Sequence, residues 1–272
     1  DISAVGDSSQ LDVVFFDVGQ GDAALVAFPN GKHLLVDAGP RSPYADAGSA
    51  VIVPHLQWYG INRLDAVVIS HADSDHLGGL PTILRRIPVE RVILNPVEEP
   101  TRLPREVHHV LDSLSVPVEP AYAGDTLSID PATYIQVLNP PKEASPWLDD
   151  NEASIVMRIV YGKTRLLFTG DIERAAERWI VTQYGDFLQS DVVKVGHHGS
   201  STSSIPALIE QAASVPGWAV ISVGRRNRFG LPAPSVLRRW QDAGTEVLTT
   251  AHDGAIWMRT DGHQVERVHW RQ

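Results

Sequence analysis

Short apolar runs alternate along the chain with longer stretches of helically spaced apolar residues, and these patterns predict strands and helices respectively. Strands are predicted over residues 11–16, 23–28, 33–36, 64–69, 91–94, 116–120, 126–130, 133–138, 153–160, 164–168, 191–195, 218–223, 246–249, 255–259 and 264–270. Helices are predicted over residues 45–60, 77–87, 103–114, 172–184 and 235–243. Because the two kinds interleave without a clear boundary or repeat, we expect a single α/β (α+β) domain over residues 11–272.

Residues 1–10 are small and polar, and we interpret them as a linker. They lack the basic start and apolar centre of a signal peptide. The chain does not begin with Met, which suggests a processed product or a piece of something longer. No apolar run approaches the ~18 residues that span a bilayer.

Composition narrows the chemistry that is open to this chain. Apolar residues make up 43% and charged residues 21%, which is typical of a globular protein. The formal net charge of -10 argues against broad electrostatic binding of nucleic acid, although a local basic strip remains compatible with it. The absence of Cys excludes disulfides, thiolate zinc sites and Cys nucleophiles.

Four potential metal ligands lie within six positions where the predicted strand 64–69 gives way to a helix. His71, Asp73 and Asp75 alternate, so an extended turn would project them together, and His76 follows as the chain enters the helix. Asp75 could instead simply cap that helix. We favour a metal site because crowded carboxylates repel one another unless a cation or proton neutralises them.

This His-x-Asp-x-Asp-His stretch resembles the metallo-β-lactamase-superfamily motif His-x-His-x-Asp-His, with Asp73 in place of the second His. The resemblance implies that His71 and Asp73 hold one divalent ion and that Asp75 and His76 hold another. Zn²⁺ accepts such ligands, but the exchange of His for Asp73 shifts the preference toward Mn²⁺ or another harder ion. We therefore expect one or two ions, either Mn²⁺ or Zn²⁺.

Other predicted strands also end in polar residues that match the superfamily pattern. The resemblance implies that Asp171 bridges the two metals and that Asp37 supports the site from behind, although Asp37 could also be a strand-end cap. Asp17 is a further supporting candidate. Asn151 stands where relatives carry a His-containing motif, and it would contribute a weak oxygen ligand or a contact.

The Gly196–Gly199 segment places two adjacent His residues after a strand. The resemblance implies that one is a metal ligand or phosphate contact and that the other is a support or proton donor, and it leaves open which is which. We take His197, His198 and Asp75 as catalytic candidates, and we include His198 among the metal ligands.

Residues 17–23, followed by the His/Asp motif, look like the soluble C-terminal domain of ComEC-type DNA-internalisation proteins. The resemblance extends over roughly residues 11–265. The two Gly residues that flank Gln20 could be turn punctuation, or they could allow a ligand to approach the backbone. One departure from the pattern is Leu231, which stands where relatives carry a His. The substrate-binding candidates are Gln20, Asp22, Ser200, Arg225, Arg226, Asn227 and Arg228.

The resemblance implies a metallo-β-lactamase-like αββα sandwich, two mixed sheets flanked by helices, with the site at one edge between the sheets. It also implies a metal-dependent phosphodiesterase or nuclease that uses a metal-activated water on DNA during uptake for natural transformation. The expected partners are single-stranded DNA and the membrane-channel portion of the same parent protein, on the periplasmic or extracytoplasmic face, without a nucleotide cofactor. The alternatives are a catalytically weak DNA-docking module and another phosphoester hydrolase, such as a phosphorylcholine-esterase-like enzyme.

Overall fold

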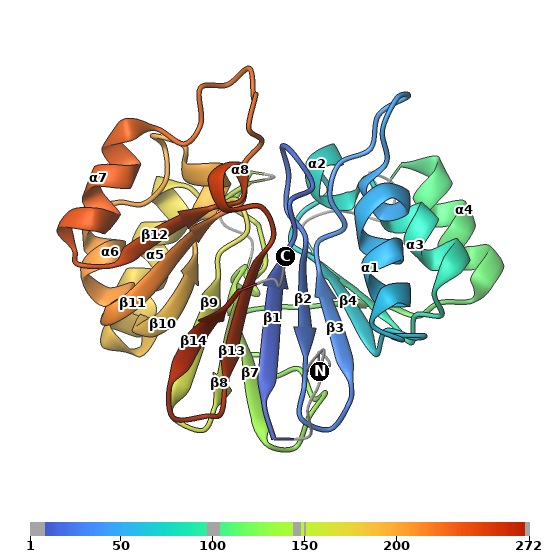
Figure 1. Ribbon diagram of the computed structural model, residues 1–272, viewed down its shortest axis with the longest axis horizontal. Coiled ribbons are helices and arrows are strands. Elements are labelled where there is room, and N and C mark those ends of the chain that lie inside the picture. Colours follow the sequence, from blue (N-terminus) through green and yellow to red (C-terminus); the bar gives the residue numbers. More distant parts are fainter. Residues whose placement is uncertain (1–8, 97–103, 144–147, 150, 270–272) are drawn as a thin grey trace.

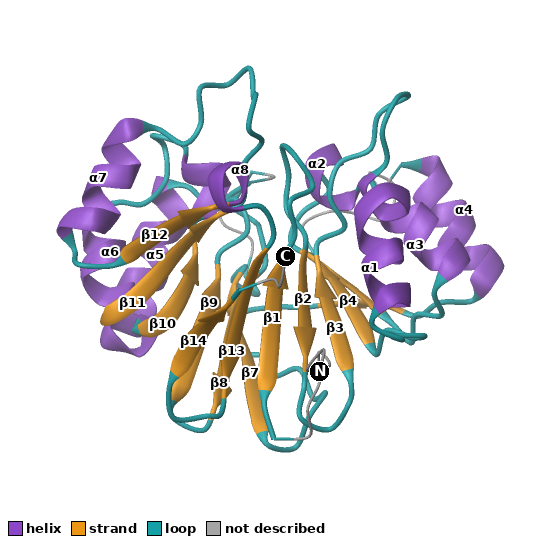
Figure 2. Ribbon diagram, viewed as in Figure 1, coloured by secondary structure: helices purple, strands orange, loops and turns teal. Residues whose placement is uncertain are grey.

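The computed structural model describes residues 9–96, 104–143, 148–149 and 151–269, so most of the expected linker at residues 1–10 lies outside the described residues. Two sheets face each other at the centre of the molecule, and helices cover the outer face of each sheet (Figures 1 and 2). The predicted αββα sandwich is confirmed.

The larger sheet is mixed, with the strand order β14-β13-β1-β2-β3-β4-β5-β6. Strands β3 to β6 run parallel to one another, whereas the remaining neighbours are antiparallel. The strands are β1 (Leu11–Phe15), β2 (Ala24–Ala27), β3 (His33–Val36), β4 (Ala66–Ile69), β5 (Val92–Leu94), β6 (Val118–Pro120), β13 (Ile256–Thr260) and β14 (Val265–Val268).

The smaller sheet has the order β12-β11-β10-β9-β8-β7 and is also mixed. Strands β9 to β12 are parallel, and β7 and β8 join them as an antiparallel extension. The strands are β7 (Thr133–Asn139), β8 (Val156–Tyr161), β9 (Thr164–Phe168), β10 (Ser190–Lys194), β11 (Ala213–Ile221) and β12 (Glu246–Thr249).

Helices from the first part of the chain pack on the larger sheet, and helices from the second part pack on the smaller sheet. The first group comprises η1 (Gly48–Ile52), α1 (Val53–Trp58), α2 (Ser74–Leu77), α3 (Leu80–Arg86) and α4 (Arg105–Leu114). The second comprises α5 (Arg174–Tyr184), η3 (Gly185–Leu188), η4 (Gly196–Gly199), α6 (Pro206–Ala212), α7 (Pro234–Asp242) and α8 (Thr250–Asp253).

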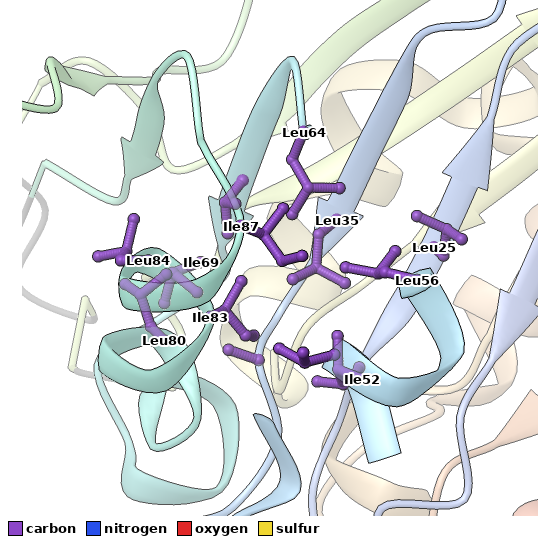
Figure 3. Close-up of a cluster of buried hydrophobic side chains, with 14 of the residues drawn as sticks. Leu25, Leu35, Ile52, Leu56, Leu64, Ile69, Leu80, Ile83, Leu84 and Ile87 are labelled. Atoms are coloured by element: carbon purple, nitrogen blue, oxygen red, sulfur yellow. The ribbon is translucent and has the colours of Figure 1, made fainter. Parts of the chain in front are cut away.

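Apolar side chains fill three layers, one between the sheets and one under each set of helices. Figure 3 shows the layer on the larger sheet, where Leu35 and Ile69 from strands meet Ile52, Leu56 and Ile83 from helices. All five side chains are at most 1% exposed. Both faces of each sheet are therefore buried, which explains why many of its strands read as continuous apolar runs rather than alternating ones.

The structure differs from the sequence analysis at a predicted strand and at a helix that was not predicted. The strand expected over residues 126–130 is wrong, because within the described chain that stretch makes only one bridge, between Thr126 and Gln136. Its apolar side chains Leu127 and Ile129 instead fill the layer between the sheets. The helix α6 was not predicted, and it starts with Pro206 in its first turn, where a missing N–H costs nothing.

No helix among the described residues combines the length and the apolar content that crossing a membrane requires.

A buried ion pair joins the two neighbouring strands β1 and β13. Asp12, which is 0% exposed, accepts hydrogen bonds from Arg259 Nε at 2.7 Å and from Trp257 Nε1 at 2.7 Å. Asp12 and Arg259 are also direct partners in the strand register. The charges of Asp12 and Arg259 thus compensate each other, which lowers the free-energy cost of burying them.

A buried acid on α5 makes stability depend on pH. Glu177 accepts hydrogen bonds from the main-chain N–H groups of Ser204 and Ile205, and burial raises its pKa from 4.5 to about 8. The folded state therefore binds this proton more tightly than the unfolded chain, so the Glu177 contribution to stability falls as pH rises between these values. The slope is up to about 1.4 kcal/mol per pH unit.

We expect Glu177→Gln to flatten this dependence, because an amide does not titrate. Urea unfolding of both proteins at intervals from pH 5 to 8 measures the slope. Parallel stability curves for the two proteins would contradict the assignment. Since the amide nitrogen cannot accept the second N–H, we expect the variant to be less stable at low pH, and only the slope of stability against pH tests the assignment.

Candidate metal centre

Four chain segments deliver polar side chains to one edge of the sandwich, near α2 and α8 (Figure 1). Strand β4 ends just before His71, β9 ends before Asp171, and β10 ends before His198. Asp22 comes from the turn that precedes β2. Segments that follow strands of both sheets therefore build the centre, at the edge between the sheets that the resemblance implies.

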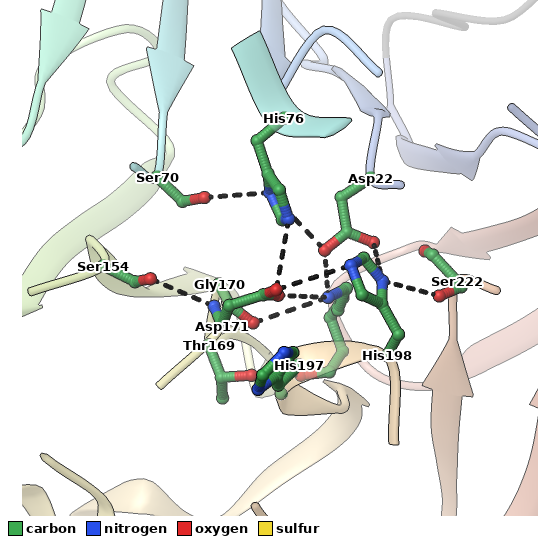
Figure 4. Close-up of polar contacts among 12 residues, drawn as sticks. Asp22, Ser70, His76, Ser154, Thr169, Gly170, Asp171, His197, His198 and Ser222 are labelled. Atoms are coloured by element: carbon green, nitrogen blue, oxygen red, sulfur yellow. Dashed lines mark hydrogen bonds and ion pairs between the residues drawn. The ribbon is translucent and has the colours of Figure 1, made fainter. Parts of the chain in front are cut away.

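The centre of this group is the buried set Asp22, His76, Asp171 and His198. Each offers one ligand atom, and these atoms all lie within 4.8 Å of one another. Asp171 Oδ2 lies 3.3 Å from His76 Nε2 and 3.4 Å from His198 Nε2 (Figure 4). Sequence analysis placed Asp22 among the substrate contacts, whereas the structure brings it into the potential ligand set.

A second layer of side chains fixes the orientation of these groups. Asp37 Oδ2 lies 3.0 Å from His76 Nδ1, and Asp37 itself accepts hydrogen bonds from the amide and hydroxyl of Ser70. The main-chain carbonyl of Ser222 lies 2.9 Å from His198 Nδ1. Both imidazoles thus present Nε2 toward Asp171, the arrangement in which outer partners orient metal-binding His residues.

The remaining residues of the His/Asp motif lie beside this set. His71 is buried, its ring centroid is 4.1 Å from that of His76, and its Nε2 is 3.6 Å from Asp73 Oδ2. Asp73 is at the N-cap of α2 with 56% of its side chain exposed. Asp75 Oδ2 lies 3.2 Å from His198 Nε2. Of the four motif residues, His76 thus belongs to the buried set, His71 and Asp75 lie beside it, and the Asp73 carboxylate pairs only with His71 within the described residues.

Lys194, which sequence analysis did not single out, lies inside the centre. It is 4% exposed, its ammonium group contacts the Asp22 carboxylate, and Nζ lies 4.0 Å from Asp171 Oδ1. Burial alone would lower the pKa of Lys194, but the carboxylates of Asp22 and Asp171 raise it. The sequence did contain a sign of this role, because a charged Lys inside the apolar run before the Gly-His-His turn is expected to have a buried partner.

His197 points to a different partner from His198. Its Nδ1 lies 2.7 Å from Glu173 Oε1, and the Thr202 hydroxyl donates to the same oxygen at 2.7 Å. Both His residues have positive φ, 47° at His197 and 51° at His198. This backbone is unfavourable for residues with a side chain and typically occurs at functional sites. Glu173 also escaped the sequence analysis.

The charges of the centre shift its protonation strongly. Burial alone would lower the pKa of His76, but Asp171 and Asp37 raise it well above its usual value. Burial would raise the pKa of Asp171, yet the charges of His198 and His76 hold it well below its usual range. Burial likewise opposes the low pKa of Asp75, about 2, which its hydrogen bond to His198 produces. Protons on the imidazoles thus supply positive charge here, and metal binding would release them.

Several buried atoms of the centre make no hydrogen bond within the described part of the chain, among them Asp22 Oδ1, His71 Nε2, His76 Nε2 and Asp171 Oδ1. Buried polar atoms rarely stay without a partner, so these atoms indicate that something else binds them. Imidazole nitrogen and carboxylate oxygen together suit a divalent ion such as Zn²⁺ or Mn²⁺. The residues present therefore fit a metal.

The family model for the metallo-beta-lactamase superfamily matches residues 16–223, which contain every potential ligand described above. The chain belongs to this superfamily. The metallo-beta-lactamase fold protein YhfI from Bacillus subtilis superposes with a TM-score of 0.55 at 15% identity, covering 92% of this chain and 100% of that one. This likeness supports the superfamily fold.

Among relatives in sequence, ComE operon protein 3 of Bacillus subtilis (strain 168) is 32% identical over 266 residues, 93% of this chain and 33% of that protein. Competence protein ComA of Neisseria gonorrhoeae is 33% identical over 246 residues, 90% of this chain and 31% of that protein. The chain thus spans about a third of the length of these relatives. They confirm the resemblance to ComEC-type proteins.

The loop after β11 departs from the superfamily pattern in a way that the structure explains. Leu231, at the position of an expected His, packs against the apolar layer under α5 to α7. The Asn227 side chain closes this loop by donating to the carbonyls of Gly224 and Leu231 and accepting from the Leu231 N–H. The imidazoles that face Asp171 come from His76 and His198.

The other predicted contacts lie around this loop. Gln20 Oε1 accepts the Gly224 N–H at 3.3 Å, which ties the Gly-rich turn to it. Arg225 donates to the Ala251 carbonyl, Arg226 is exposed, and the Arg228 guanidinium lies 5.0 Å from the centroid of the Phe229 ring.

Three predicted contacts lie elsewhere. Ser200 bonds Thr202. Asp17 is exposed and accepts the Gly19 N–H, and Asn151 lies half-buried in the turn before β8. The Asp17 carboxylate is thus occupied in its own turn.

Proposed function

We propose that this chain is a metal-dependent phosphodiesterase that cleaves DNA during DNA uptake for natural transformation. The observation that supports it most is the buried set Asp22, His76, Asp171 and His198 beside the His197–Glu173 pair. Relatives named for competence support DNA as the substrate. The remaining two thirds of such a parent protein would supply the membrane channel, and this domain would lie on the extracytoplasmic side.

In the proposed reaction, His76, Asp171 and His198 would hold a divalent ion, and His71, Asp73 and Asp75 lie next to these ligands. A bound divalent ion supplies Lewis-acid polarisation of the phosphoryl group and an activated water. Asp37 fixes the orientation of the His76 imidazole, and the Ser222 carbonyl fixes that of His198, so the chain provides a preorganised site. His197, fixed at Nδ1 by Glu173, keeps Nε2 to protonate the leaving oxygen.

Substrate contacts would come from the loop after β11. Arg225, Arg226 and Arg228 would bind flanking phosphates through paired N–H donors. Phe229 is 59% exposed and would offer a ring for stacking an unpaired base, which favours single-stranded DNA. The local positive charge of this loop would offset the acidic net charge of the chain.

The test of this proposal is cleavage of end-labelled single- and double-stranded DNA with Mn²⁺, Zn²⁺, Mg²⁺ or a chelator. An Asp75→Ala/His76→Ala double variant is the control. We expect metal-dependent cutting that the control loses. A folded sample that binds DNA but does not cut it with any of these metals would instead support a docking module, with Leu231 as the point of loss relative to the superfamily pattern.

We expect His197→Asn to slow cleavage of DNA by about 10²- to 10⁴-fold, the usual contribution of a general acid. The same variant should cleave bis(p-nitrophenyl) phosphate almost normally, because nitrophenolate leaves without a proton. Turnover on the two substrates gives the ratio, and His263→Asn in the exposed turn after β13 is the matched control. An equal loss on both substrates would show that His197 does not deliver the proton.

A further inference from the structure

Lys194 is a cation that the fold itself places in the metal centre. It is the last residue of β10, in the smaller sheet, whereas Asp22 precedes β2 in the larger sheet. Its ammonium group contacts the Asp22 carboxylate, and the Gly170 carbonyl accepts from Nζ at 3.5 Å. Fully buried Lys side chains are rare unless they are paired, so this contact is a built feature of the site.

The partners of Lys194 are themselves potential metal ligands. Asp22 and Asp171 belong to the four-residue set, and Lys194 Nζ reaches both. A carboxylate oxygen that faces an ammonium group at hydrogen-bond distance cannot direct the same lone pair at a dication. Two like charges on one small carboxylate also repel strongly in a site from which water is excluded. Lys194 therefore occupies Asp22 Oδ2, and a second divalent ion bound through Oδ1 would face the repulsion of this ammonium group.

Within the described residues, Lys194 forms its ion pairs with Asp22 and Asp171 and not with the two His residues of the set, and Asp171 lies farther from the ammonium group than Asp22 does. His76 Nε2 and His198 Nε2 both face Asp171 Oδ2, on the oxygen that is not the one nearest Lys194. One ion can thus be held by these three side chains while Asp22 stays paired. The structure divides the centre into a three-residue ion site and a carboxylate that is already neutralised.

We propose that Lys194 is a positioning residue that takes the place of a second ion, so that the centre binds one divalent ion tightly and Asp22 stays out of its coordination. The inference rests on the metal centre of the proposed function and is independent of whether the substrate is DNA. A count of bound ions without substrate tests it, so a failure to cut DNA and a failure of this inference remain distinct results.

The experiment measures Mn²⁺ binding to the whole chain by equilibrium dialysis with elemental analysis and by calorimetry. The wild-type protein should bind one ion tightly. Lys194→Met should release Asp22 and bind either a second ion or the first about 10- to 100-fold more tightly, the usual range for changes next to a metal ligand. Lys194→Met/Asp22→Asn should lose that gain, because the released carboxylate is gone.

Two controls keep the result interpretable. Lys163→Met, in the exposed turn between β8 and β9, should bind as the wild type does. Lys194→Arg keeps the charge and should still bind one ion, so it serves if the Met variant does not fold. Two tightly bound ions in the wild type, or unchanged or weaker binding by a folded Lys194→Met, would overturn the proposal.

Discussion

Replacing Asp171 by Asn is expected to lower metal-dependent cleavage by at least about 10³-fold. Asp171 Oδ2 faces both His76 and His198, so the side chain joins ligands from the two sheets. An amide in its place removes a charged ligand from a site where a metal contributes several kcal/mol of transition-state stabilisation. At about 1.4 kcal/mol per tenfold change in rate, that loss amounts to three decades or more.

The measurement is the initial rate of DNA cleavage across a titration of Mn²⁺, together with Mn²⁺ affinity. We expect both to fall in Asp171→Asn, while Asp242→Asn on the exposed end of α7 retains wild-type values. The Asp171 N–H donates to Ser154 Oγ at 3.1 Å, and the substitution leaves this contact in place, so the variant should fold. Wild-type metal affinity in Asp171→Asn would remove Asp171 from the ligand set.

Replacing Asp12 by Ala is expected to lower the free energy of unfolding by about 3 to 5 kcal/mol, the usual cost of removing one partner from a buried ion pair. Arg259 is 8% exposed, and the substitution leaves its guanidinium without the carboxylate that compensates it. Trp257 Nε1 also loses its acceptor on Asp12. The substitution thus removes the ion pair with Arg259 and the hydrogen bond from Trp257 at the same time.

Denaturant unfolding followed by circular dichroism gives the free energy for Asp12→Ala. Asp112→Ala, on the exposed side of α4, is the matched control and should change stability by no more than about 0.5 kcal/mol. A loss below about 1 kcal/mol in Asp12→Ala would show that Arg259 finds compensation elsewhere.

Local patterns predicted those parts of the fold and centre that depend on neighbours in sequence. The apolar runs before His71, Asp171 and His198 specify buried strands, and polar residues directly after such strands must lie at a sheet edge. The motif spacing therefore located these side chains, and the structure brings them together. The superfamily resemblance added the sandwich, which periodicity alone could not distinguish from other α/β folds.

Contacts between distant segments could not be predicted in this way. Lys194 is part of the centre because it contacts Asp22, which comes from the other sheet. The sequence pattern around Lys194 does not specify that pairing. Glu173 likewise becomes a partner of His197 through the packing of α5 against the Gly-His-His turn. The stretch 126–130 has strand-like residues, but packing between the sheets leaves it a single bridge.

The division of the centre between the two sheets has a consequence for biosynthesis. Asp22 and His76 are made early, whereas Asp171 and His198 are made late and come from the opposite sheet. A chain whose synthesis has not reached β9 contains Asp22 and His76 but neither Asp171 nor His198, so it has no complete centre. The complete set of potential ligands therefore forms only late, when the two sheets have come together.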